Sequence, residues 1–221
     1  MDEAMSDRSD DPHASGVILT AGAPLTEAQL AIVLIHGRGA TAESMFAFAQ
    51  ELPTEGAALL SPQADGSQWY PYSFLEPIER NEPWLSSALR FLERLVAHVD
   101  DDGPGRGRTV LVGFSQGACL MLEFLVRHAA HFGGVAGLSG GLIGPPGTPR
   151  SYDGSLAATP VFLGCGDRDP HIPVARVEET RDVLAGMGAD VDARIYPGMG
   201  HTVNADEIVA VGRVIDAVAA T

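Results

Sequence analysis

Short apolar runs alternate with longer amphipathic segments along most of the chain. β-Branched and aliphatic residues dominate runs that predict strands at 17–20, 31–35, 57–60, 109–112, 135–138, 160–165 and 190–196. Apolar residues at helical spacing predict helices at 42–52, 85–99, 118–126, 174–187 and 204–219. Strands that alternate with helices favour a mainly parallel sheet covered on both faces. In such an α/β fold the ligand site lies at the carboxyl ends of the strands.

One long interval, residues 61–83, has no periodicity but is rich in aromatic side chains. It holds Trp69, Tyr70, Tyr72 and Phe74 between several prolines. Loops of this length inside a domain are usually functional or disordered, and the aromatic content argues against disorder. Two interpretations stay open: a surface loop packed on its own rings, or the wall of a substrate pocket.

The strongest local pattern is a strand, a sharp turn and a helix within Thr109–Val126. At the bend stands Gly113-Phe114-Ser115-Gln116-Gly117, the pattern of a nucleophile elbow. Such a turn is strained and needs small residues two before and two after the serine. Ser115 would then sit at a helix N-terminus, where free N–H groups and the helix dipole favour a developing negative charge.

A second string of the same form occurs at Gly137-Leu138-Ser139-Gly140-Gly141. It also follows a predicted strand, but the residues after it, Leu-Ile-Gly-Pro-Pro-Gly, cannot start a helix. The context therefore selects Ser115 and indicates that Ser139 belongs to a glycine-rich loop.

An activated serine needs a histidine within hydrogen-bond reach and an acid that orients this histidine. Strand 160–165 ends in Gly166-Asp167-Arg168-Asp169-Pro170, and strand 190–196 ends in Pro197-Gly198-Met199-Gly200-His201. This is the order Ser, Asp, His that the elbow predicts. We favour Asp169 over Asp167, because an aspartate at the strand terminus more naturally caps the turn.

Other histidines fit less well. His171 is only two residues from Asp169, too close for both to reach one serine easily, and we expect His36 to orient the turn beside it. A metal site made of His36, Asp167, Asp169 and His201 lacks any recognised ligand spacing, so we favour no metal.

Four blocks in this order resemble a known family: HGRGA, GFSQGA, GDRDPHIP and PGMGH. They look like those of the carboxylesterase/phospholipase family of small α/β-hydrolases, which includes acyl-protein thioesterases and bacterial short-chain carboxylesterases. The resemblance runs from about Ala31 to His201. It implies an α/β-hydrolase fold without a cap domain, with Ser115 as nucleophile, Asp169 as orienting acid and His201 as base. It also implies an oxyanion hole from the backbone N–H groups of Arg38 and Gln116, and no cofactor.

Arg38 departs from the thioesterase pattern, in which a leucine is usual. Its cation would face the site, and with the aromatic residues Trp69, Tyr70, Tyr72 and Phe74 it favours smaller, polar or anionic esters. We therefore expect a serine carboxylesterase for small esters. An acyl thioesterase or lysophospholipase acting on longer chains is the alternative enzyme, lactones remain open as substrates, and a non-catalytic binding module is the alternative of another class.

Length and composition limit the number of domains, the partners and the cellular compartment that we expect. A length of 221 residues with 45% apolar content fits one domain, here 16–221, after a flexible acidic tail at 1–15 that includes His13. The net charge of −15 makes nucleic acid and anionic membrane poor partners. Cys119 and Cys165 fall on a predicted helix and a predicted strand, as reduced core thiols would. The start of the chain resembles no targeting signal, so we expect a cytoplasmic protein; a homodimer is one open state of assembly.

Overall fold

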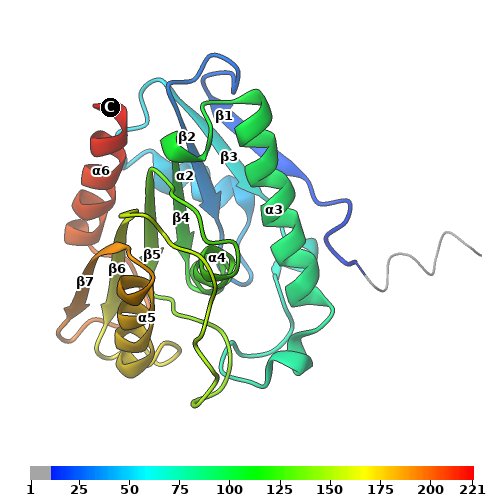
Figure 1. Cartoon of the computed structure of the whole chain (residues 1–221), viewed down its shortest axis with the longest axis vertical. Helices are drawn as coiled ribbons and strands as arrows, with labels where there is room; N and C mark the ends of the chain where they lie inside the picture. Colours follow the sequence, from blue (N-terminus) through cyan, green and yellow to red (C-terminus); the bar gives the residue numbers. More distant parts are fainter. Residues whose placement is uncertain (1–10) are drawn as a thin grey trace, which may run out of the picture.

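A seven-stranded sheet runs through the computed structural model, which describes residues 11–221 (Figure 1). The strands lie in the order β1-β3-β2-β4-β5-β6-β7. Only β1 is antiparallel to its neighbour, and every other pair is parallel. The strands are β1 (Ile18–Gly22), β2 (Leu30–Ile35), β3 (Ala57–Pro62), β4 (Thr109–Phe114), β5 (Gly134–Leu138), β6 (Pro160–Gly166) and β7 (Asp190–Tyr196).

Helices cover both faces of this sheet, as the alternating pattern predicts. They are α2 (Ala42–Ala49), α3 (Trp84–Asp102), α4 (Gln116–Arg127), α5 (Val174–Gly186) and α6 (Ala205–Ala219). Residues of α3, α4 and α5 share one core cluster, and residues of α2 and α6 share the other. The predicted α/β fold with a mainly parallel sheet is thus confirmed.

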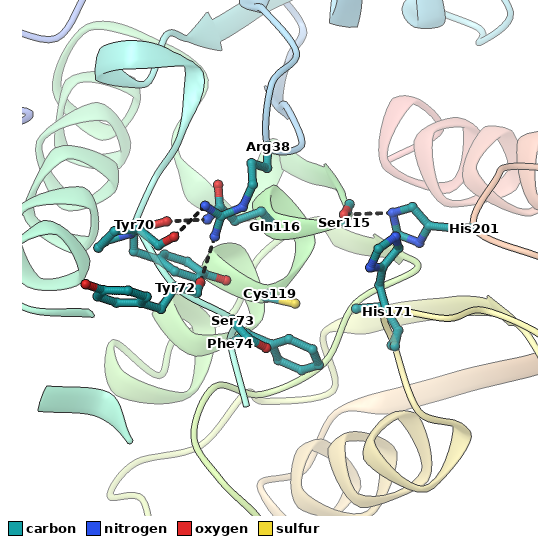
Figure 2. Close-up of a pocket in the computed structure, with 12 residues that line it drawn as sticks. Arg38, Tyr70, Tyr72, Ser73, Phe74, Ser115, Gln116, Cys119, His171 and His201 are labelled. Atoms are coloured by element: carbon teal, nitrogen blue, oxygen red, sulfur yellow. Dashed lines mark hydrogen bonds between the residues drawn. The ribbon is translucent and has the colours of Figure 1, made fainter. Parts of the chain in front are cut away.

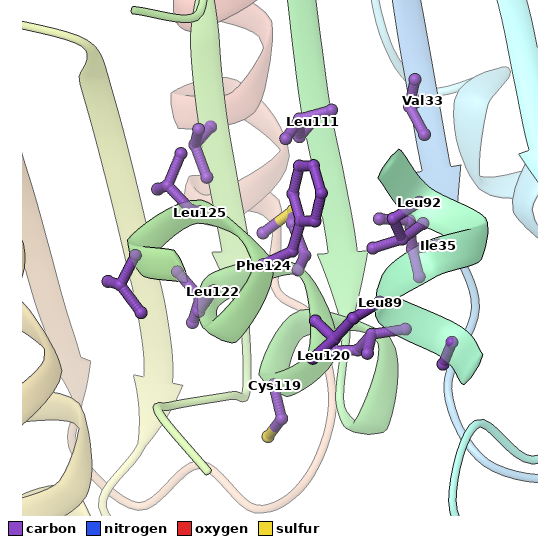
Figure 3. Packing of buried hydrophobic residues seen from close by; sticks show 14 of the residues in the cluster. Val33, Ile35, Leu89, Leu92, Leu111, Cys119, Leu120, Leu122, Phe124 and Leu125 are labelled. Atoms are coloured by element: carbon purple, nitrogen blue, oxygen red, sulfur yellow. The ribbon is translucent and has the colours of Figure 1, made fainter. Parts of the chain in front are cut away.

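The central strand β4 shows how one run of residues serves both layers. Successive side chains of a strand point to opposite faces, so Leu111 joins the cluster under α3 and α4 while Val110 and Val112 join the cluster under α6. Figure 3 shows Leu111 beside Phe124 of α4, with Leu89 of α3 nearby. A strand buried on both sides needs an unbroken apolar run, and β4 has one.

The start of the described chain differs from the flexible tail expected at 1–15. His13 is only 1% exposed. Its Nε2–H donates to the Trp69 carbonyl oxygen at 3.0 Å, and its backbone N–H donates to Ser87 Oγ at 2.7 Å. These contacts hold residues 11–15 against α3, so the expectation is wrong for that stretch. The rest of the expected tail, residues 1–10, lies outside the described residues.

Within residues 11–221, no helix combines the length and the apolar character that crossing a membrane would require.

The turn between β4 and α4 brings two backbone segments into unusually close contact. A Cβ atom on Gly117 would lie 2.3 Å from the Ile35 carbonyl oxygen and 2.4 Å from that of His36. A Cβ on Gly113 would lie 2.7 Å from Ala118 Cα. Both positions therefore exclude any side chain, which is the steric reason for the two glycines that flank Ser115.

We predict that Gly117→Ala lowers the free energy of unfolding by about 1 to 3 kcal/mol, because the added methyl group meets fixed carbonyl oxygens. Gly186→Ala in α5 is the matched control, since a Cβ there meets no atom within 4 Å. This control variant should not lower the free energy of unfolding and should raise it by up to about 1 kcal/mol. Urea unfolding of both variants measures the difference, and equal stabilities would contradict the steric account.

Candidate active site

Ser115 stands in a backbone conformation that few non-glycine residues adopt. Its φ is 54° and its ψ is −121°. Its N–H donates to the Leu138 carbonyl oxygen at 2.9 Å, which ties the turn to β5. Ser115 occupies the N-cap position of α4, yet its side chain caps no helical N–H. Strain of this kind persists only where the surroundings enforce it, and here it turns the hydroxyl away from the helix.

The Ser115 hydroxyl lies within hydrogen-bond distance of the His201 imidazole, which in turn lies within hydrogen-bond distance of the Asp169 carboxylate. Ser115 Oγ lies 2.8 Å from His201 Nε2 (Figure 2), and His201 Nδ1 lies 2.7 Å from Asp169 Oδ2. Because an ionised carboxylate can only accept, the ring proton is on Nδ1. Nε2 is then left as an acceptor for the serine hydroxyl. The structure thus brings together the three residues that the sequence selects.

Asp169 is held as a buried anion. Its side chain is 0% exposed. Besides His201, it accepts the backbone N–H groups of His171 at 2.8 Å and Ile172 at 3.1 Å through Oδ1. Burial alone would raise the pKa of Asp169, but the hydrogen bonds from His201 and these two N–H groups outweigh it and lower that pKa. The carboxylate therefore stays ionised opposite the imidazole.

The rejected alternatives occupy other positions. Asp167 accepts the Gly198 N–H at 2.6 Å and so caps the turn that leads to His201. His36 is buried, and its Nε2 accepts the Ala64 N–H at 3.1 Å while Nδ1 donates to the Gly37 carbonyl oxygen. Ser139 is also buried and follows β5, but the chain then enters a loop. No group of three or more His, Cys, Asp or Glu side chains within residues 11–221 is placed to hold a metal ion.

A cavity of about 390 Å³ opens beside Ser115 and His201 at the carboxyl ends of the strands. Its lining includes four of the five side chains expected to bind substrate: Arg38, Tyr70, Tyr72 and Phe74. In Figure 2 these side chains lie on one side of the cavity, with Ser115 and His201 on the other. Residues 70–74 of the irregular 61–83 segment therefore form one wall of this cavity, which favours the second of the two interpretations.

Trp69 is the exception, and its expected role in binding substrate is wrong. Its side chain is 0% exposed and is not part of the cavity lining. The indole Nε1–H donates to the His36 carbonyl oxygen at 2.8 Å, and the ring lies 5.0 Å from the His36 ring and 5.6 Å from that of His13. A large apolar ring with one satisfied polar atom gains most from full burial. Trp69 anchors the loop from beneath.

The two residues whose backbone N–H groups are predicted for the oxyanion hole also fasten this loop, through their side chains. Gln116 Oε1 accepts the Trp69 N–H at 2.9 Å, and its Nε2 donates to the Tyr70 carbonyl oxygen at 2.7 Å. The Arg38 guanidinium donates to Gln68 Oε1, to the Pro71 carbonyl oxygen and to the Tyr72 carbonyl oxygen, at 3.1, 2.7 and 2.7 Å. The pocket wall is thus hydrogen-bonded to the elbow itself.

His171 and Cys119 are among the cavity-lining residues that sequence reasoning missed. His171 lies edge-on to His201, with ring centroids 4.9 Å apart. Its position in the loop after β6, two residues from Asp169, is the sequence signal that could have identified it. Cys119 lies one helical turn after Ser115 and so shares its face of α4. Burial raises the pKa of the Cys119 thiol to about 12, so it stays protonated.

The fold and the elbow define the class of protein as an α/β-hydrolase. A family model described as Phospholipase/Carboxylesterase matches residues 20–219, and the chain belongs to this family. It is a hydrolase of carboxylic ester or thioester bonds.

Individual proteins support the same assignment. The chain is similar to a phospholipase/carboxylesterase crystal structure from Dyadobacter fermentans, with 41% identity and a TM-score of 0.87 over 90% of this chain and 96% of that one. It is 26% identical to acyl-protein thioesterase 1 of Saccharomyces cerevisiae over 86% of this chain and 93% of the relative. With acyl-protein thioesterase 1 of Gibberella zeae it is 31% identical over 61% of this chain, which spans only 59% of that relative.

We predict that both thiols resist alkylation in the folded protein. Burial raises the pKa of Cys119 and of Cys165 to about 12, whereas an ordinary cysteine titrates near 8.5. The thiolate fraction at pH 8, and with it the rate of reaction with iodoacetamide, should be roughly a thousandfold lower than in the unfolded chain. The folded rate should then rise as the pH is raised. Similar rates with and without denaturant would contradict the burial of these thiols.

Proposed function

We propose that this hydrolase is a serine carboxylesterase that cleaves short-chain carboxylic esters through an acyl-enzyme. The observation that carries the proposal is the continuous hydrogen-bonded chain from Ser115 through His201 to Asp169. A serine is a weak nucleophile until a base can take its proton, and a neutral imidazole is that base.

In the proposed reaction, Ser115 Oγ attacks the carbonyl carbon as His201 Nε2 takes the hydroxyl proton. The tetrahedral intermediate collapses, the C–O bond to the alcohol breaks, and His201 returns the proton to the leaving alkoxide. Water, activated by His201 in the same way, then cleaves the acyl-enzyme and releases the carboxylic acid. Asp169 holds the imidazole in the required tautomer and stabilises the imidazolium that forms in each step.

The negative charge that develops on the carbonyl oxygen needs donors fixed in place beforehand. We assign this role to the backbone N–H groups of Gln116 and Arg38. Within residues 11–221, neither N–H donates to another protein group. Gln116 is the first residue of α4, and a Cβ on Gly37 would lie 3.3 Å from Ser115 Cβ, so the 37–38 turn lies against the nucleophile.

The size and lining of the cavity support small acyl groups. A volume of about 390 Å³ is at the small end of the range for ligand pockets, roughly 300–1,000 Å³. Its apolar lining includes Phe74, Cys119 and Ile172. Phe74 is held firmly, because its carbonyl oxygen accepts the Gly144 N–H at 2.7 Å and the Arg176 guanidinium lies 5.8 Å from its ring.

The second candidate is a thioesterase or lysophospholipase for longer acyl chains. The similarity to acyl-protein thioesterase 1 of Saccharomyces cerevisiae favours it. Both candidates use the same three residues, so the length of the preferred acyl chain separates them.

We predict that Ser115→Ala lowers kcat for a short-chain p-nitrophenyl ester at least about 10⁴-fold, since it removes the hydroxyl that His201 Nε2 would activate. Asp169→Asn should lower it by up to about 10⁴-fold, because an amide favours the wrong imidazole tautomer. Circular dichroism should show both variants folded. Substantial activity in folded Ser115→Ala would contradict the proposed mechanism.

A series of p-nitrophenyl esters of increasing acyl length should give its highest kcat/KM at short chains. Phe74→Ala should shift the maximum toward longer chains, because it removes the ring from the cavity wall, and Phe74→Leu should shift it less. A wild-type maximum at long chains would instead support the thioesterase or lysophospholipase candidate.

A further inference from the structure

We propose that the cavity takes esters that carry a carboxylate, and that the Arg38 guanidinium binds this carboxylate. The inference rests on the proposed function and specifies its substrate class. It makes Arg38 a specificity-determining residue through its side chain, in addition to the oxyanion role of its backbone.

Arg38 gives the cavity a fixed positive charge with no negative charge beside it. None of the twelve lining residues is Asp or Glu, and Arg38 is the only arginine among them. Asp169, the nearest acid along the catalytic chain, is fully buried and hydrogen-bonded behind His201. An anion that enters this cavity therefore meets a cation without meeting an exposed carboxylate.

The positive charge of the guanidinium is not compensated by its protein partners, because all of them are neutral. Its three acceptors are one amide oxygen and two backbone carbonyl oxygens. No carboxylate of the described chain lies within ion-pair distance of it, whereas Arg80, Arg106, Arg150, Arg176 and Arg194 each have such a partner. A cation that is left without a counter-ion is one that a substrate anion can pair with.

The same bonds fix the guanidinium in place and leave donors for a ligand. Arginine has five N–H donors, and three are used by Gln68, Pro71 and Tyr72. Nε–H and one Nη2–H remain without an acceptor in the described chain, and free guanidinium N–H groups can donate to the oxygens of a carboxylate. Figure 2 shows the guanidinium beside the loop, across the cavity from His201. A side chain already held by three bonds loses little further entropy when it binds an anion.

Because the whole chain is strongly negative, binding of an anionic substrate depends on the local positive charge of Arg38. With 29 acidic residues against 14 basic ones, the protein repels anions at long range. A carboxylate-bearing ester binds in this cavity more tightly than a neutral ester only if a local charge-assisted hydrogen bond outweighs that repulsion. The simplest rival account is that Arg38 only fastens the 71–72 backbone, and this account predicts no discrimination by substrate charge.

The test compares matched esters by pH-stat titration. Monomethyl glutarate against methyl hexanoate places the carboxylate on the acyl side, and acetoxyacetate against butyl acetate places it on the alcohol side. We expect a larger kcat/KM for the anionic member of one pair. Arg38→Met should lower that anionic-to-neutral ratio by about 10- to 100-fold, the size of a lost charge-assisted bond. Arg38→Lys should recover part of it.

The matched control is Arg213→Met on α6, which removes the same charge from an exposed position outside the cavity and should leave the ratio unchanged. A ratio that Arg38→Met does not change, or equal losses on both members of a pair, would overturn the proposal and favour the fastening role.

In the wild-type protein, glutarate should also inhibit hydrolysis of methyl hexanoate competitively, and absence of inhibition at tens of millimolar would count against the proposal. Failure of the proposed function looks different: hydrolysis would then be absent or would persist in Ser115→Ala.

Discussion

The contact between the start of α4 and the end of β2 is the constraint on which the rest of the site depends. Gly117 lies so close to the Ile35 and His36 carbonyl oxygens that a Cβ atom would approach them within 2.4 Å. That approach, with the positive φ of Ser115, turns the serine hydroxyl out of the N-cap and toward His201. The N–H groups at the start of α4 are then left uncapped by the Ser115 side chain. One steric fact thus sets both the orientation of the proposed nucleophile and the helix terminus beside it.

The pocket wall depends on the same elbow. Gln116 follows the serine and holds the backbone of Trp69 and Tyr70, and Arg38 holds that of Pro71 and Tyr72. Beneath them, Trp69 fills the space between the His36 turn and α3. The cavity wall and the proposed oxyanion donors therefore come from one connected set of residues. A change at Arg38 or Gln116 should affect substrate selection through the loop as well as the reaction itself.

Periodicity predicted the strands, the helices and the residues at the strand ends, because each of these depends on local sequence. Ser115, Asp169 and His201 could be selected from strand order and turn chemistry alone. The roles of the aromatic residues in the loop could not be predicted in this way, since nothing in the pattern distinguishes Trp69, which does not line the cavity, from Tyr70 and Phe74, which do. The partners that decide these roles, His13, His36 and Gln116, are 33 to 56 positions away in the chain. The burial of His13 was missed for the same reason.

The most direct test of the central claim is to find which serine is the nucleophile. The chain offers an internal comparison, because Ser139 also has a positive φ, of 48°, after a parallel strand. The protein is treated with a fluorophosphonate, its intact mass is measured, and the modified peptide is sequenced by mass spectrometry. The account predicts a single adduct on Ser115 and none in Ser115→Ala. An adduct on Ser139, or a folded and unmodified protein, would contradict it.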